Sequence, residues 1–421
     1  MQQNEEIGDR RKGPLAGVRI IDLSSVLMGP FATMFLADKG ADVIKVEAPG
    51  GDITRNVGRS PGHGMAPVFQ HINRNKRSIV LDLKSKRGKA ILLDLVKDAD
   101  VVVYNMRRAA MDRLGLGYEA LQAINPKLVY CGFAGFGHDG PYSDRPAYDD
   151  VIQGLVGIPD LMQRGSGAEP RYAPLAIADR IVSLYGLNAI MMALFEQRNI
   201  GRGAAIEIPM FESMAHFVLV EHMFYRSFDP PLGQSVSPRP VDLNRRPYQT
   251  ADGYICVLPY TDLHWQRLFI AICREELIAD QLYCSFERRI ENVQSLYRIL
   301  SDALLERSTG DWLAVFDKVD VPAGRMNSID DLIDDPHLNS VNFFKPVIDD
   351  LGSCFIHIDV PIGDGSAAEA KLRPAPRKGQ HSAQVLGELG LSEADQATLF
   401  AENISQDDPD RTRSSIEPKL G

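Results

Sequence analysis

The segments that predict the fold lie between residues 18 and 47: VRIIDL (18–23), GPFATMFLADKG (29–40) and ADVIKVE (41–47). The first and third are short runs rich in β-branched apolar residues, as in buried strands. The middle segment has apolar residues at helical spacing and ends on Gly40, a residue suited to a helix C-cap. A strand, a helix and a second strand in this order predict a crossover unit with two parallel strands.

The same alternation continues along the first half of the chain. We expect strands in residues 77–83, 100–105, 127–133 and 204–210, and helices in residues 86–99, in a stretch that runs through Leu121, and in residues 180–199. This pattern is typical of an α/β fold with a doubly wound, Rossmann-like parallel sheet and helices on both faces.

Composition and charge exclude several classes of protein. The chain has 421 residues and a net charge of −10, without a long run of Lys and Arg, which argues against nucleic acid as its main partner. No segment approaches the ~18 uninterrupted apolar residues of a membrane span, and the N-terminal residues lack the apolar core of a secretory signal. The five cysteines are scattered, as reduced thiols often are. We therefore expect a soluble cytoplasmic enzyme that does not act on a membrane.

The sequence lacks the motifs of three common kinds of site: a dinucleotide site, a hydrolase nucleophile elbow and a histidine metal site. The loop after the first strand, SSVLMGPF (24–31), contains only Gly29, whereas a dinucleotide site needs G-x-G-x-x-G there. Residues 58–62 match the letters of a hydrolase elbow, G-x-S-x-G, but Pro61 has no N–H to donate to an oxyanion. His216 and His222 lie six residues apart in an apolar helical stretch, and no histidine pattern predicts a metal site.

Asp179 is the carboxylate with the strongest claim to a special role. It lies directly before a long apolar helix, where Asp is a preferred N-cap residue. The same position near the helix N-terminus favours the ionised carboxylate, and an ionised carboxylate can act as a covalent nucleophile. The residues alone leave both interpretations open, and the two are compatible.

Several long segments together resemble the family III CoA-transferases, which include formyl-CoA transferase and are related to the α-methylacyl-CoA racemases. The resemblance covers residues 13–399, and its segments are 14–55, 73–121, 125–141, 148–157, 176–210, 251–255, 321–338 and 373–392. It implies that Asp179 attacks an acyl-CoA to give a mixed anhydride, which is converted to an aspartyl-CoA thioester and then exchanged with an acceptor acid. Coenzyme A and acyl-CoA would be substrates, and no metal or prosthetic group is expected.

The resemblance also implies a CoA site at the carboxyl ends of the strands. The matching positions are Val26, Leu81, Lys84, Asn105, Met106, Arg107 and Arg113, with Tyr148 and Asp149 near the nucleophile. Arg and Lys suit the phosphates of CoA. The alternative for the arginines is an ordinary solvated helical face.

Departures from the family pattern narrow the expected reaction. Tyr148 stands where the racemase relatives have a His, and a Tyr is a poor base at neutral pH. Leu27 replaces the polar residue of formyl-CoA transferase, and residues 228–247 lack its glycine-rich loop. We therefore expect transfer between small organic acids other than oxalate and formate. An acyl-CoA isomerase, a CoA hydrolase and a non-catalytic CoA-binding protein remain as alternatives.

Composition and the family resemblance together predict the domain organisation. We expect a flexible N-terminus (1–12), a large α/β domain that binds CoA (13–225), a Pro-rich linker (226–247), a small α+β domain (248–330), a segment that returns to the large domain (331–402) and a flexible polar tail (403–421). The resemblance further implies an interlocked homodimer.

Overall fold

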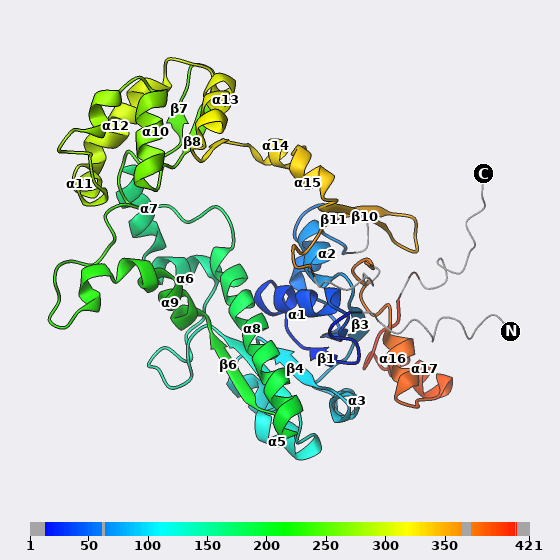
Figure 1. Ribbon diagram of the computed structural model, residues 1–421. Coiled ribbons are helices and arrows are strands. Elements are labelled where there is room, and N and C mark those ends of the chain that lie inside the picture. The colour runs from blue at the N-terminus through cyan, green and yellow to red at the C-terminus, as the bar shows by residue number, and fades with distance from the viewer. Residues whose placement is uncertain (1–12, 61–63, 364–371, 409, 411–421) are drawn as a thin grey trace, which may run out of the picture. The chain divides into compact units, whose positions relative to one another are not determined.

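The computed structural model contains the predicted parallel sheet, seen in Figure 1, and describes residues 13–60, 64–363, 372–408 and 410. Its strands are β1 (Arg19–Asp22), β2 (Asp42–Glu47), β3 (Arg77–Val80), β4 (Val101–Tyr104), β5 (Val129–Ala134) and β6 (Ala205–Pro209). Their order is β3-β2-β1-β4-β5-β6, and every neighbouring pair is parallel. This is the strand order of a doubly wound sheet, so the predicted fold class is confirmed.

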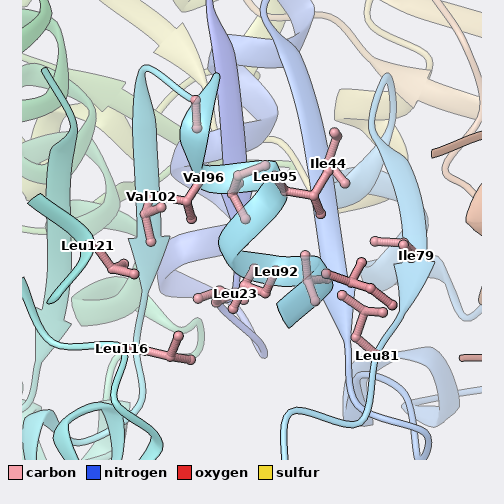
Figure 2. Close-up of a cluster of buried hydrophobic side chains, with 14 of the residues drawn as sticks. Leu23, Ile44, Ile79, Leu81, Leu92, Leu95, Val96, Val102, Leu116 and Leu121 are labelled. Carbon is pink, nitrogen blue, oxygen red and sulfur yellow. The ribbon is translucent and has the colours of Figure 1, made fainter. Parts of the chain in front are cut away.

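One face of the sheet is covered by α3 (Lys86–Lys97), α5 (Tyr118–Ile124), α16 (Ser382–Glu388) and α17 (Glu393–Ala401). Side chains alternate between faces along a strand, so Ile44, Ile79 and Val102 all point to this side. Figure 2 shows Leu92 and Leu95 of α3 packed against them. This cluster forms the main hydrophobic core of the large unit.

The opposite face is covered by α1 (Met28–Asp38) and α8 (Ile177–Ile200), which pack against each other. Gly186 brings α8 close to β5, because a Cβ there would lie 2.2 Å from Cζ of Phe133. By length and composition, α8 alone among the described helices could cross a membrane. That is weak support for a span, since α8 also packs on β5 and β6 of the sheet.

The large unit contains several further elements: η2 (Ile53–Asn56), α2 (Pro67–Asn73), α4 (Arg108–Leu114), and the hairpin of β10 (Phe344–Ile348) and β11 (Cys354–Ile358). Two helices run from the large unit into the smaller one: α6 (Asp149–Leu155), which enters it at Gln153, and α9 (Met210–His222), which enters it at Phe217. The helix expected to run through Leu121 is two helices, because Gly115 ends α4 in the left-handed conformation at φ 68°. His216 and His222 lie in α9, as the apolar helical stretch predicts.

A smaller unit has its own sheet and core. Its elements are α7 (Ile158–Ser166), η3 (Phe224–Ser227), β7 (Tyr248–Gln249), β8 (Tyr254–Val257), α10 (Asp262–Ala271), η4 (Glu275–Ile278), α11 (Phe286–Glu291), α12 (Val293–Leu304), α13 (Thr309–Val319), β9 (Ala323–Arg325), α14 (Ile329–Ile333) and α15 (Pro336–Ser340). Trp265, Leu296, Trp312 and Phe316 are central to its buried core. Residues 228–247 form loops and turns without a helix or strand.

The chain folds into two compact units. Residues 153–174 and 217–339 form the smaller unit, and the remaining segments form the larger one. The domain boundaries drawn from the sequence stay predictions. Residues 1–12 and most of the predicted tail lie outside the described residues. The start of that tail is packed rather than free: Ser405 Oγ donates a 2.7 Å hydrogen bond to the carbonyl of Val80, and Asp408 pairs with Arg377 at 2.6 Å.

Candidate active site

Asp179 does not cap α8. The N-cap residue is Ala176, whose side chain makes no cap hydrogen bond, and Asp179 is the third residue of the helix. The N–H of Asp179 instead donates to Oδ1 of Asp149, over 3.0 Å. Asp149 therefore satisfies one of the free amide groups in the first turn of α8, which is the work of a capping side chain. The capping interpretation of Asp179 is wrong because the helix begins earlier than expected.

The side chain of Asp179 is left in an unusual electrostatic environment. It is half-buried, and no described residue donates a hydrogen bond to its carboxylate. Burial, together with the negative charge of Asp149, raises the pKa of Asp179 to about 6, and Arg180 opposes this shift. The carboxylate is therefore ionised at neutral pH but poorly stabilised. Perturbed groups of this kind are candidates for catalytic roles.

Ser183 fixes the first turn of α8 against the start of α1. Its side chain is 1% exposed, and Oγ lies 2.6 Å from the carbonyl oxygen of Asp179 and 2.6 Å from that of Met28. The hydroxyl proton can serve either carbonyl. Asp179 is thereby held next to the loop that joins β1 to α1, which contains Val26.

Val26 has the backbone strain often found at functional loops. Its φ is 69°, in the left-handed region that a β-branched residue rarely adopts. Its N–H donates to Oδ1 of Asp52 over 3.3 Å. Asp52 is in turn held by Lys45, whose Nζ lies 2.9 Å from Asp52 Oδ2 and 2.9 Å from the carbonyl of Ser24. A buried ion pair thus positions both ends of the loop.

Asn105 connects the same loop to the end of β4. Its Nδ2 donates to the carbonyl of Ser25 over 2.7 Å, and its Oδ1 accepts from the N–H of Ser25 over 3.0 Å. β1 and β4 are neighbours at the point where the strand order reverses. In open α/β sheets, ligands bind beyond the carboxyl ends of the strands at this point. The structure therefore places Val26 and Asn105 where a ligand site is expected.

Fully buried charges lie under this loop. Asp22 and Lys76 form an ion pair of 3.0 Å in which neither side chain is exposed. Burial alone would raise the pKa of Asp22, but Lys76 and Lys45 lower it to about 2. Burial lowers the pKa of Lys76 to about 8. Removing either partner would leave an uncompensated buried charge, so the network holds the β1 end in one arrangement.

Sequence reasoning missed Lys45, Asp52, Lys76 and Ser183. A signal was available for the strand charges, because Asp22 and Lys45 each interrupt an apolar strand and must find a buried partner. The identity of the partners was not available. Lys76 is 54 residues from Asp22 along the chain, and only the tertiary fold brings them together.

The other predicted positions are more scattered. Tyr148 is 72% exposed and directly precedes Asp149. Met106 is half-buried and Arg107 is exposed, and both follow the end of β4. Leu81 is fully buried in the core cluster, so its side chain is not free to contact a ligand.

Lys84 and Arg113 are exposed, and within the described residues no hydrogen bond or ion pair joins them to Asp179. Among all residues that the structure describes, no group of three or more His, Cys, Asp or Glu side chains could hold a metal ion.

Comparison with known proteins gives a consistent result. The model of CoA-transferase family III matches residues 15–382. The chain is 35% identical to the succinate–glutarate CoA-transferase of Agrobacterium fabrum over 389 residues, which is 90% of this chain and 96% of that protein. It is 35% identical to the acetyl-CoA:oxalate CoA-transferase of Acetobacter aceti over 323 residues, or 74% and 80% of the two chains. A CaiB/BaiF family protein from Brucella suis has a similar structure, with a TM-score of 0.75, 34% identity and coverage of 90% and 100%.

Proposed function

Because the chain belongs to CoA-transferase family III and is an enzyme of the CoA-transferase type, we propose that Asp179 is its nucleophile. The observation that carries this proposal is the half-buried Asp179 carboxylate, which no described residue hydrogen-bonds and whose pKa is about 6. Such a carboxylate is charged at neutral pH yet weakly stabilised, so it gains more from attack on a carbonyl carbon than a solvated one does.

The first half-reaction forms the enzyme thioester. An oxygen of Asp179 attacks the thioester carbonyl of the donor, the C–S bond breaks, and a mixed anhydride and CoA thiolate form. The thiolate then attacks the carbonyl carbon of Asp179. The donor acid leaves with the bridging oxygen, and an aspartyl-CoA thioester remains.

The second half-reaction runs the same chemistry in reverse. The acceptor carboxylate attacks the aspartyl thioester, which releases CoA thiolate and gives a new mixed anhydride. The thiolate then attacks the acyl carbon of the acceptor. Acyl-CoA is released, and the bridging oxygen from the acceptor stays on Asp179 as a free carboxylate. No step requires a metal or a prosthetic group.

The CoA substrate would lie along the carboxyl edge of the sheet. In support, Asn105 is hydrogen-bonded there to Ser25, the neighbour of Val26, and the exposed Arg107 lies three residues after the end of β4. Lys84 and Arg113 would serve as more distant phosphate contacts, since both are exposed. Leu81 would contribute only backbone, because its side chain belongs to the core.

Relatives suggest where the search for substrates should begin. The relative from Agrobacterium acts on succinate and glutarate, and the one from Acetobacter acts on oxalate, at equal identity to this chain. We propose small carboxylic acids as both donor and acceptor groups. Succinate and glutarate are the first pair to test, because that relative matches over more of the chain.

We also propose a homodimer in the cytoplasm. α8 carries large apolar side chains that no other part of the chain covers: Met192 is 66% exposed and Phe195 is 71% exposed. A second copy would cover them, since contiguous exposed apolar surface often marks an interface. All five cysteines are unpaired, which fits a reducing compartment.

Oxygen labelling tests the proposed role of Asp179 directly. The enzyme is incubated with succinyl-CoA and glutarate labelled with ¹⁸O in both carboxylates, and the peptide that contains Asp179 is then analysed by mass spectrometry. We expect that peptide to gain about 2 Da after one turnover and about 4 Da after many, because each turnover leaves one acceptor oxygen on Asp179. The peptide that contains Asp149 is the internal control and should stay unlabelled.

A negative result is equally clear. If glutaryl-CoA forms and the Asp179 peptide keeps its natural mass, the covalent route through Asp179 is wrong. If no exchange occurs with these acids, the same experiment with other labelled acids decides between a different substrate pair and a different mechanism.

A further inference from the structure

The smaller unit contains a pocket of about 550 Å³ that has no part in the reaction steps proposed above. Its lining comes from residues 238–248, from β8 and the loop after it, from α10, α11 and α12, and from residues 322–324 at the start of β9. All of these residues belong to the smaller unit. Pockets of this volume are typical of sites for small molecules.

The interior wall of the pocket is apolar and aromatic. Val257 and Trp265 are each 7% exposed and Leu296 is fully buried, so their side chains form an apolar wall with little contact with water. Phe286 and Ile290 also line the pocket, and each is 45% exposed. A hydrocarbon group placed against these residues would gain roughly 25 cal/mol for each Å² removed from water.

The charged part of the lining has one sign. It contains Arg239, Arg245, Arg246 and Arg289 and no Asp or Glu. Within the described residues, none of the first three forms an ion pair, and the Arg239 guanidinium lies over the ring of Tyr260 at 5.4 Å. An anion is therefore the ligand that this lining attracts.

Arg289 is the most buried of the four arginines. Its side chain is 6% exposed; Nη1 donates to the carbonyl of Tyr283 over 2.9 Å, and Nη2 pairs with Asp262. Nε is buried and has no hydrogen-bond partner among the described residues. Its own bonds hold Arg289 in the wall of the pocket, so an anion is left to Arg239, Arg245 and Arg246, which line the pocket and are partly or fully exposed.

We propose that this pocket binds a small organic carboxylate with an aromatic or branched hydrocarbon body. The body packs against Trp265 and Leu296, and the carboxylate pairs with Arg239, Arg245 and Arg246. A nucleotide fits less well, because the apolar wall would leave many of its polar atoms without partners. The site goes beyond the proposed function, since its chemistry does not involve Asp179.

Tryptophan fluorescence gives a direct test on the full chain. The chain has two tryptophans, so Trp312→Phe leaves Trp265 as the only emitter. We expect 3-phenylpropionate to change this emission saturably, with at least tenfold tighter binding than its neutral amide. Propionate, which lacks the ring, should also bind at least tenfold more weakly. Equal binding of the acid and the amide would overturn the proposal.

A second measurement works on the unmodified chain, in case Trp312→Phe fails to fold. Cys256 lines the pocket and is exposed. We expect 3-phenylpropionate to slow its alkylation at least fivefold, while Cys354, an exposed thiol of the larger unit, reacts unchanged. Unchanged alkylation of Cys256 at saturating acid would overturn the proposal.

Matched variants separate a specific role from a structural one. Arg239→Gln and Arg246→Gln should each weaken binding of the acid at least tenfold and leave binding of the amide unchanged. Arg267→Gln is the control, because Arg267 pairs with Asp320 in the same unit but does not line the pocket. Asp179→Asn should bind the acid normally, so this test and the labelling test fail independently. Competition by CoA at low micromolar concentration would show a nucleotide site and overturn the carboxylate assignment.

Discussion

The main-chain N–H of Asp179 donates a 3.0 Å hydrogen bond to the carboxylate of Asp149. Asp149 and Asp179 therefore have different roles. Asp149 satisfies the start of α8, and Asp179 keeps a carboxylate that no described residue hydrogen-bonds. The stability of the helix end and the reactivity of Asp179 can therefore be changed separately, which makes both testable.

Asp179→Asn should abolish transfer without harming the fold. We expect CoA exchange to fall at least about 10³-fold, as for loss of a covalent nucleophile. Because the pKa of the Asp179 carboxyl is raised, its charged form opposes folding at pH 7, by at most about 3 kcal/mol. The melting temperature of the variant at pH 7 should therefore be unchanged or higher. Exchange assays and thermal unfolding on the same preparation check both parts, and a large fall in melting temperature would contradict them.

The pH profile of transfer should have an acidic limb near pH 6. A carboxyl group with a pKa of about 6 is protonated below that pH, so the rate should fall about tenfold for each further pH unit. The linked stability has the opposite sense. A pKa raised by folding stabilises the protein at low pH, and this contribution is lost as the pH rises through 6. Rate measurements between pH 4.5 and 8 test the limb, and a rate that is constant down to pH 4.5 would contradict it.

Asp149→Asn should move that limb to lower pH. Asn retains an oxygen that can accept the N–H of Asp179, so the helix start is preserved. The negative charge that helps to raise the pKa of Asp179 is removed, and the pKa should fall. The measured quantity is the midpoint of the acidic limb. An unchanged midpoint would show that burial alone sets the pKa.

Val26→Gly should be more stable than Val26→Ala. Both variants lose the branched side chain, but Ala keeps the Cβ that is disfavoured at a φ of 69°. We expect the free energy of unfolding of Val26→Gly to exceed that of Val26→Ala by about 1 kcal/mol. The usual order in a strand or helix is the reverse, so equilibrium unfolding in urea gives a clear sign.

Asp52→Asn should destabilise the chain by about 3 kcal/mol, because it leaves the buried ammonium of Lys45 without its partner. Adding Lys45→Met should recover part of this loss, so the double variant is less destabilised than the sum of the two single ones. Denaturant unfolding of the three variants tests this. Additive losses would show that the pair is not coupled.

Much of this protein could be predicted from its sequence. Apolar periodicity identified the six strands of the sheet and the long helix, because period and length are local properties. The order and spacing of the segments indicated the family, and the comparisons confirm it. The choice of Asp179 as nucleophile also came from the sequence and remains a prediction.

Only the tertiary structure decided how the site is held. Asn105 and Ser25 are 80 residues apart, and Lys76 and Asp22 are 54 apart. A buried polar side chain must find a partner, but the chain sequence does not say which of many it will be. The same holds for Asp149 at the start of α8 and for the strained Val26. Local patterns determine elements, whereas pairing of buried charges depends on which elements the fold brings together.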